Sequence, residues 1–363
     1  MLSKACLVGA YQRKLEELAR HDAIALTCLV PPYWLQDGTP IRLERAHVRG
    51  YRLAVTPVRF NGHFHVFHFT RLRAWLAATQ PDVVHVDEEP YNLATALALR
   101  LAARAGARRL FFTWQNLLRR YPPPFSLWER YSFHTAQHAL AGNREAVDVL
   151  HQKGYRGPVT VVPQFGIDPE VFRPRPRPVR REFVIGYAGR LVEEKGLDVL
   201  LEAVQGLAGP WRLQLVGSGP AQPALARQAA RLGIAERVEF VAQAPSTAMP
   251  AIVAAWDALA LPSRTRPNWK EQFGRILVEA MASGVPCVGS TSGEIPHVLG
   301  DAGLVVPEGD AAALGAALAR LQSAPALRAR LAERGRARVL AHYTQQRVAE
   351  RTYAVYRRLM GAA

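Results

Sequence analysis

The chain has 363 residues, of which 49% are hydrophobic and 21% are charged, an ordinary composition for a globular protein. It is longer than the size at which one hydrophobic core usually stops growing, so we expect two domains. No run of about 20 apolar residues occurs, so we predict no transmembrane helix. The formal net charge of +16 favours phosphate, nucleic acid or anionic lipid as partners, and composition alone does not choose among them.

Short apolar runs alternate with helical patterns along the whole chain. The first run, residues 4–9, is too short for a signal peptide and predicts a first strand. Most runs are continuous rather than alternating, which is typical of parallel strands buried on both faces. Strands are predicted at 24–30, 53–58, 83–86, 110–114, 139–142, 159–162, 183–187, 213–216, 238–241, 258–261, 286–289 and 304–306. Helical stretches such as 93–105, 197–207, 221–232 and 311–321 lie between them, so the fold class is α/β with doubly wound sheets.

A proline-rich, basic segment at residues 173–181 reads RPRPRPVRR. Alternating prolines exclude a helix, and the like charges keep the segment extended. We therefore interpret residues 173–181 as a linker between a first domain, residues 1–172, and a second domain, residues 182–343.

The cysteines and histidines do not form a metal signature. Cys6, Cys28 and Cys287 are odd in number and lie in apolar runs, which favours buried thiols in a reducing cytoplasm. Three histidines cluster within residues 61–69, but their spacing fits no metal motif and no cysteine or carboxylate accompanies them. We predict no metal site.

Residues 271–286 read EQFGRILVEAMASGVP and carry the most informative pattern of the chain. Gly274 stands where a helix is expected to begin, and the Gly-Val-Pro stop leads into a buried strand. The N-terminus of such a helix offers backbone N–H groups and a positive dipole end, which suit a phosphate. Glu271 precedes the helix, and Glu279 lies about two turns along it.

Arg190 and Lys195 follow the predicted strand at 183–187, just beyond Gly189. Residues at the carboxyl end of a parallel strand face the ligand crevice of a doubly wound sheet. Two fixed cations there would stabilise the growing negative charge of a departing diphosphate. The alternative is a solvated charged loop, because Glu193 and Glu194 stand beside Lys195.

Three segments between residues 163 and 286 together resemble the retaining glycosyltransferases of family 4, also called group 1, which have the GT-B fold. Residues 271–286 resemble the donor-site signature of that family. Residues 186–196, GYAGRLVEEKG, resemble its Arg/Lys segment, and residues 163–172, PQFGIDPEVF, resemble its interdomain junction.

This resemblance implies two Rossmann-like domains that face each other across a cleft, with a C-terminal helix, about residues 344–363, that crosses back to the first domain. It implies a metal-independent, hexosyltransferase-type enzyme without a cofactor. The reaction would move a sugar from a UDP- or GDP-linked donor to the hydroxyl of a glycan or a lipid-linked acceptor. Synthesis of a glycan, a glycolipid or a cell-envelope polysaccharide is the expected role.

The resemblance also implies residue roles. Arg190 and Lys195 would contact the donor diphosphate, Glu271 the hydroxyls of the donor sugar, and Glu279 those of the ribose. Backbone contacts to the donor are expected at Phe273, Gly274 and Arg275, at the strand-end turns of Gly189 and Gly217, and at Gly9 in the first domain.

Polar residues also follow two predicted strands of the first domain. Glu88 and Glu89 come after residues 83–86, and three consecutive acids are rarely buried without partners. Gln115 and Asn116 come after residues 110–114, where many relatives place a histidine that Gln115 replaces. Because glutamine does not titrate near pH 7, we expect Gln115 to orient a substrate rather than exchange protons. These four residues are acceptor-side candidates.

Two other classes remain as alternatives. A GT-B epimerase or a phosphorylase-like enzyme would share the fold, and a non-enzymatic nucleic-acid-binding protein would explain the charge. No nucleic-acid-binding module is recognisable, so no nucleic-acid partner is expected. The charge also suggests a protein of the cytoplasm that attaches peripherally to an anionic inner membrane face. Within this hypothesis, residues 64–75 form either a basic membrane-touching helix or a helix packed on the core with an exposed arginine face.

Overall fold

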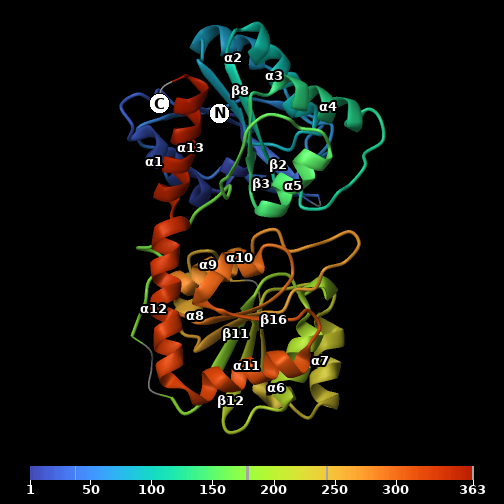
Figure 1. The fold of residues 1–363 in the computed structure, drawn as a ribbon, viewed down its shortest axis with the longest axis vertical. Coiled ribbons are helices and arrows are strands. Elements are labelled where there is room, and N and C mark those ends of the chain that lie inside the picture. The colour runs from blue at the N-terminus through green and yellow to red at the C-terminus, as the bar shows by residue number, and fades with distance from the viewer. Residues whose placement is uncertain (37, 177–179, 243, 362–363) are drawn as a thin grey trace. The chain divides into compact units, whose positions relative to one another are not determined.

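The computed structural model describes residues 1–36, 38–176, 180–242 and 244–361 (Figure 1). The chain divides into two compact units. One consists of Met1–Gly166 together with Gln345–Ala363, and the other of Ile167–Thr344. Each unit contains a parallel sheet, as the continuous apolar runs predict.

The sheet of the first unit is built from β1 (Thr27–Val30), β4 (Arg52–Val55), β7 (Val83–Val86), β8 (Arg108–Thr113), β9 (His138–Ala141) and β10 (Val159–Val161). These strands pair in the orders β1-β4 and β10-β9-β8-β7, and all of the pairs are parallel. Leu2 forms a parallel bridge with Leu29 of β1 and another with Val86 of β7. A single residue therefore joins the two sets of strands.

The predicted strand at residues 4–9 is wrong. These residues enter two short 3₁₀ helices, Ala5–Leu7 and Gly9–Gln12. The Lys4 backbone N–H donates to the Glu88 carboxylate at 2.9 Å, and the Cys6 carbonyl accepts from Gln12 Nε2 at 2.9 Å, so neither group serves a strand ladder. Because Cys6 and Leu7 are both buried, a short apolar run here marks a buried 3₁₀ turn, which periodicity cannot distinguish from a strand.

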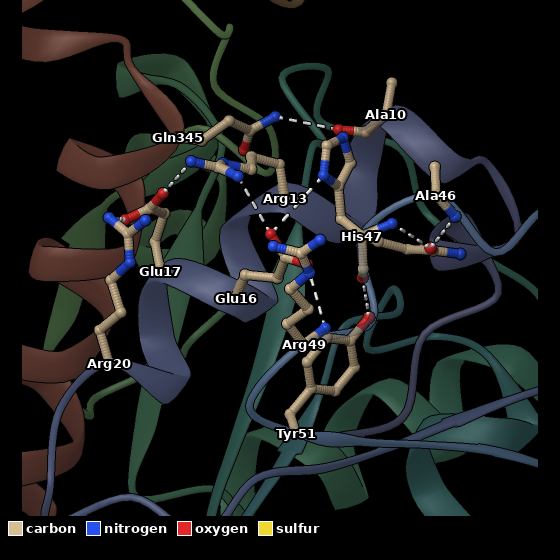
Figure 2. Close-up of polar contacts among 11 residues, drawn as sticks. Ala10, Arg13, Glu16, Glu17, Arg20, Ala46, His47, Arg49, Tyr51 and Gln345 are labelled. Carbon is tan, nitrogen blue, oxygen red and sulfur yellow. Dashed lines mark hydrogen bonds and ion pairs between the residues drawn. The ribbon is translucent and has the colours of Figure 1, made fainter.

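The helices of the first unit are α1 (Arg13–Ala19), α2 (Leu72–Thr79), α3 (Leu93–Arg104), α4 (Phe125–Thr135), α5 (Arg144–Gln152) and α13 (Gln345–Leu359). The helix α13, which we predicted near the C-terminus, packs against α1. Its first residue, Gln345, donates from Nε2 to the Ala10 carbonyl at 3.2 Å (Figure 2). The same nitrogen donates to the Gly166 carbonyl at 2.9 Å. The end of the chain is thus fastened to the start of the first unit.

Two antiparallel hairpins of the first unit were not predicted. One pairs β2 (Tyr33–Gln36) with β3 (Thr39–Arg42), and the other pairs β5 (Val58–Arg59) with β6 (His68–Phe69). Asn61 ties them together, because its side chain accepts from the Leu35 N–H and donates to the Tyr33 carbonyl, both at 2.9 Å. Within residues 64–75, Phe67, Phe69 and Leu72 are buried whereas Arg71 and Arg73 are exposed, which favours the core-packed interpretation of that segment.

The second unit has a six-stranded parallel sheet with the order β13-β12-β11-β14-β15-β16. Every strand predicted beyond residue 181 is present. Their bounds are β11 (Phe183–Ala188), β12 (Trp211–Val216), β13 (Val238–Val241), β14 (Ala258–Leu261), β15 (Cys287–Ser290) and β16 (Leu304–Val306). The helices are α6 (Leu197–Gln205), α7 (Gln222–Arg231), α8 (Met249–Ala254), α9 (Arg275–Ala282), α10 (Ile295–Leu299), α11 (Ala311–Ser323) and α12 (Pro325–His342).

The strand order of this sheet reverses between β11 and β14. The chain adds strands outward from β11 to β13, then returns to pair β14 against β11 and adds outward in the other direction. Ligands of doubly wound sheets bind at the carboxyl ends of the strands at such a reversal. We therefore expect a ligand-binding site at this edge of the second unit.

The predicted linker, residues 173–181, falls within the second unit. Its residues 177–179 lie outside the described residues, and the others have no helix or strand. The end of the segment is anchored, because Arg180 donates to the Ala255 carbonyl and forms an ion pair with Asp257 at 3.1 Å.

We predict that Gly186→Ala destabilises the second unit. A Cβ at this position in β11 would lie 1.8 Å from the Trp256 ring, which is fully buried. Overpacking of this kind costs about 1–3 kcal/mol, which would lower the midpoint of urea denaturation. The matched control is Gly206→Ala, because a Cβ at Gly206 meets nothing within 4 Å. Equal midpoints for the two variants would contradict the prediction.

Candidate functional site

Glycines shape the loops that follow β11 and β12. The backbone φ angles of Gly189 and Gly217 are 154° and 140°, and a Cβ at Gly217 would lie 2.0 Å from the Gly189 carbonyl oxygen. A Cβ at Gly219 would likewise lie 2.3 Å from the Leu191 carbonyl oxygen. The two loops therefore pack backbone against backbone, which accounts for Gly217, whereas a Cβ at Gly189 would lie 2.8 Å from the Tyr187 hydroxyl oxygen.

Lys195 and Glu271 meet at the carboxyl edge of this sheet. Lys195 Nζ lies 2.6 Å from Glu271 Oε2, which also accepts a hydrogen bond from Ser263 Oγ at 2.8 Å. The side chains of Lys195 and Glu271 are only 15% and 9% exposed, and the ammonium lies 4.7 Å from the centroid of the Trp269 ring. Two candidates that stand 76 residues apart in sequence thus form one largely buried ion pair at the reversal of strand order.

Two further glycines allow this pairing. Gly196, next to Lys195, has a φ of 65°, and a Cβ there would lie 2.1 Å from the Pro262 carbonyl oxygen. Gly293 has a φ of 52°, and a Cβ there would lie 2.0 Å from the Glu271 carbonyl oxygen. A side chain at Gly196 would push the Lys195 loop away from the loop after β14, and one at Gly293 would push the loop after β15 away from Glu271.

Arg190 has a different environment from Lys195. Its side chain is 69% exposed, and its guanidinium lies 3.5 Å from Glu194 in the same loop. Because an exposed pair of this kind contributes little to stability, the Arg190 side chain can leave Glu194 for a ligand.

Gly274 begins α9 in the left-handed conformation, with a φ of 71°. A Cβ there would lie 2.9 Å from Leu261 Cδ2 and 3.0 Å from Leu277 Cδ1, so glycine is required on both conformational and steric grounds. On the first turn of the helix, Arg275 Nε donates to Glu279 Oε1 at 2.7 Å. Burial raises the pKa of Glu279 above its usual value, and Arg275 opposes this shift. Phe273 lies just before the helix, with its ring 5.7 Å from that of Tyr343.

The loop after β14 is braced to its neighbours. The Arg264 N–H donates to the Glu194 carbonyl at 2.8 Å, and the Arg264 guanidinium pairs with Asp198 at 2.9 Å. Thr265 Oγ1 donates to Glu308, which follows β16, at 2.8 Å. The loops that carry Lys195 and Glu271 are therefore held in place before any ligand binds. From the sequence, residues 263–270 are expected to form one wall of the donor pocket, with Arg264 as a contact. The individual bonds from Ser263 to Glu271 and from Arg264 to Asp198 depend on the tertiary fold and were not predicted.

In the first unit, the Gly9 N–H is already paired. It donates to Glu44 Oε2 at 2.6 Å, and a Cβ at Gly9 would lie 2.7 Å from Ala46 Cβ. Residues 44–51 are also held by α1 and the residues before it, because Gln12 Oε1 accepts from Ala46 and Glu16 accepts from the Arg49 N–H at 3.0 Å (Figure 2). The Glu44 carboxylate thus accepts from the Gly9 N–H, which we predicted to donate to the diphosphate of the donor.

The acids after β7 take separate partners. Glu88 forms an ion pair with Lys4, and Glu89 accepts from Thr113 Oγ1 at 2.6 Å and from the Trp114 N–H at 2.8 Å. Burial raises the pKa of Glu89 to about 7, although both hydrogen bonds oppose the shift. Burial also raises the pKa of Glu88.

Gln115 and Asn116 follow β8 and are both buried. Gln115 Oε1 accepts from Lys153 Nζ at 3.2 Å, and Asn116 Nδ2 donates to Glu145 at 3.2 Å. Lys153 was not predicted as a site residue. It stands just after α5 and reaches Gln115 only through the tertiary fold.

The residues that the structure describes contain no group of three or more histidines, cysteines or acids that could hold a metal ion. Within the same ranges, every helix is too short or too polar to cross a lipid bilayer.

Two family descriptions match consecutive parts of the chain. Residues 169–338 match "Glycosyl transferases group 1", and residues 19–171 match "Glycosyltransferase Family 4". The chain therefore belongs to the group 1 family of glycosyltransferases.

Among curated relatives, the D-inositol 3-phosphate glycosyltransferase of Mycobacterium marinum is 34% identical over 212 residues, which are 54% of this chain and 44% of that protein. The match thus spans about half the length of such curated relatives.

The solved structures support the GT-B fold. A glycosyltransferase from Rickettsia africae superposes with a TM-score of 0.76 at 15% identity, over 100% of this chain and 98% of that one. Anabaena HepE in complex with UDP superposes with a TM-score of 0.74 at 17% identity, over 98% of both chains. Similarity at this level of identity establishes the fold, so the chain has two Rossmann-like domains of the GT-B class.

We predict that Glu89 makes stability depend on pH. Between about pH 4.5 and pH 7 the folded chain keeps a proton on Glu89 that the unfolded chain releases, so the contribution of Glu89 to stability falls as the pH rises through this window. The loss amounts to about 3 kcal/mol at most. Urea denaturation of the wild type and of Glu89→Gln from about pH 4 to pH 8 measures it, because the glutamine variant lacks this titration. Parallel pH profiles for the two proteins would refute the assignment.

Proposed function

We propose that the protein is a retaining glycosyltransferase that moves a hexose from a UDP- or GDP-linked donor to an acceptor hydroxyl. The observation that supports this proposal most strongly is the largely buried ion pair between Lys195 and Glu271, which lies at the reversal of strand order in the second unit. It supports the proposal because it places one cation and one carboxylate side by side, as a ligand with both diphosphate and sugar hydroxyls requires. Membership of the group 1 family and the UDP complex of HepE agree with this choice.

In the proposed reaction the bond between the sugar C1 and the diphosphate oxygen breaks. The acceptor hydroxyl forms its bond to C1 on the same face, and its proton passes to the departing phosphate oxygen. Lys195, the exposed Arg190 and the N-terminus of α9 would stabilise the charge that develops on the diphosphate. Glu271 would accept hydrogen bonds from the hydroxyls of the donor sugar, while Glu279, once Arg275 moves, would accept from the ribose.

Metal independence is part of the proposal, since these side chains and the helix dipole would supply the positive charge. For the acceptor we propose a glycan or a lipid-linked molecule of the cell envelope. One curated relative is named for D-inositol 3-phosphate, which makes a phosphorylated polyol a reasonable first acceptor to test.

We predict that UDP or GDP and their sugars raise the melting temperature, in buffer with EDTA as well as with magnesium. Ligand that binds the folded chain at about 100 times its dissociation constant stabilises it by about 2.7 kcal/mol. Differential scanning fluorimetry with UDP-glucose, GDP-mannose and the free nucleotides measures the shift. Stabilisation by RNA or DNA at physiological salt, with no response to nucleotides, would instead support a nucleic-acid-binding protein.

We predict that Lys195→Met and Glu271→Gln each lower turnover of the donor by about 100-fold or more, since each removes a charge that acts on the transition state. The control is Arg212→Met, because Arg212 forms an ion pair with Glu182 near the amino ends of the strands of the same sheet. Release of nucleoside diphosphate measures turnover. Full activity in either site variant, with circular dichroism showing a folded chain, would rule out this site.

The membrane proposal concerns the first unit. Phe60 and Tyr33 are 57% and 39% exposed, and Arg42 and Arg59 are exposed in the same pair of hairpins. Exposed aromatic and basic side chains on a chain of net charge +16 suit an anionic lipid surface.

We predict that the wild type floats with liposomes that contain phosphatidylglycerol and not with phosphatidylcholine alone, and that Arg59→Glu/Phe60→Ser floats less. The control Arg231→Glu changes one exposed arginine of the second unit. Equal recovery of the protein with both kinds of liposome would contradict the proposal that it binds an anionic membrane.

A further inference from the structure

Lys153 is a buried lysine beneath one of the acceptor-side candidates. Its side chain is 8% exposed, and its ammonium lies 2.6 Å from Glu129 Oε1 of α4, which is 9% exposed. Burial lowers the pKa of Lys153 and raises that of Glu129, whereas their mutual contact opposes both shifts. A buried pair of this kind contributes little net stability, so its presence calls for another reason.

The ammonium of Lys153 fixes the orientation of the Gln115 side chain. An ammonium can only donate hydrogen bonds, so the group of Gln115 that faces it at 3.2 Å must be the carbonyl oxygen Oε1. The backbone of Gln115 is held too, because its N–H donates to Thr113 Oγ1 at 3.0 Å. With the oxygen committed to Lys153, the NH₂ group is the end of the amide that remains for another partner.

That NH₂ group is buried without a partner. Gln115 is 8% exposed, and among the described residues nothing accepts a hydrogen bond from its Nε2. Leaving a buried donor unpaired destabilises a fold, and most such groups in native proteins are paired. The oxygen of this amide is used by Lys153, whereas its NH₂ group is a donor that the described residues leave available for a ligand.

The position of Gln115 favours such a ligand. Gln115 stands two residues after the end of β8, at the carboxyl edge of the parallel sheet in the first unit, where doubly wound domains bind ligands. Thr113 links Gln115 to Glu89, because Thr113 Oγ1 accepts from the Gln115 N–H and donates to the Glu89 carboxylate. Both polar groups therefore lie at one strand end.

We propose that Gln115 donates a hydrogen bond from Nε2 to an oxygen of a bound sugar, and that Lys153 is the positioning residue that presents this donor. The oxygen belongs either to the donor sugar or to the acceptor, and the inference rests on the proposed glycosyl transfer. In contrast to a histidine, the amide offers its donor at every pH near neutrality.

The test uses the full chain with UDP-glucose and GDP-mannose as donors, and with water or D-inositol 3-phosphate as acceptors. Gln115→Met and Gln115→Glu both lack the donor at neutral pH, and each should lose turnover by about 10-fold or more, as the loss of one hydrogen bond predicts. If hydrolysis and transfer both fall, the oxygen is on the donor sugar. If only transfer falls, it is on the acceptor.

Lys153 is tested by coupling. Lys153→Met alone would leave the buried Glu129 carboxylate without its cation. The variant to use is therefore Lys153→Met/Glu129→Gln, which removes both charges. In that background the amide is free to rotate, so Gln115→Met should cost several-fold less turnover than in the wild type. Lys153→Arg, which keeps a donor, should retain more turnover than the double variant. Equal effects of Gln115→Met in both backgrounds would overturn the positioning role.

Urea denaturation separates this inference from the proposed function. The comparison is made in the Lys153→Met/Glu129→Gln background, because in the wild type Gln115→Met would also remove the oxygen that accepts from Lys153. If Nε2 is unpaired in the folded chain, Gln115→Met keeps or raises the midpoint of that background. A clearly lowered midpoint, or full turnover in Gln115→Met, would overturn the inference. A wild type that turns over no nucleotide sugar would count against the proposed function, and the urea comparison would still decide whether the Gln115 donor is unpaired.

Discussion

The ion pair between Lys195 and Glu271 is the interaction on which the second unit's functional edge depends. The two side chains are 15% and 9% exposed, so each charge has little contact with water and gains from the other. The pair therefore requires that the loops after β11 and β14 remain close, and the αL glycines at 196 and 293 permit the necessary backbone contacts. In the proposed function the same pair would meet a diphosphate sugar, with Lys195 on the diphosphate and Glu271 on the sugar hydroxyls.

The two units use the same principle with different groups. In each, a parallel sheet brings polar side chains from distant parts of the chain to the carboxyl ends of its strands. The second unit places a cation and a carboxylate there, with Arg190 left exposed beside them. The first unit places Glu89, which burial keeps largely protonated below pH 7, and the amide of Gln115. Both edges also hold ion pairs, Lys195–Glu271 in the second unit and Lys4–Glu88 in the first, but the first unit adds the amide of Gln115 and the carboxyl group of Glu89 as hydrogen-bonding groups.

Most strands of both sheets and the start of α9 could be predicted from the sequence, because they depend on local residue patterns. Continuous apolar runs identified the strands of both sheets, and the order Glu271, Gly274, Glu279 located a loop and the start of a helix. Local patterns failed where the answer depends on the tertiary fold. Cys6 and Leu7 look like a strand but are buried in a 3₁₀ turn, since the partners of their neighbours, Glu88 and Gln12, could not be known. Lys153 and Glu44 were missed for the same reason: nothing near them in sequence marks the groups they meet.

The bracing of the loops in the second unit has a consequence for redesign. Arg264 holds the Glu194 carbonyl and the Asp198 carboxylate, and Thr265 holds Glu308, so the segments after β11, β14 and β16 are joined through contacts that each needs from the others. A segment transplanted alone from a homologue would bring its own half of each contact and find no counterpart. Chimeras that aim at a new specificity should therefore exchange the three segments as one cassette.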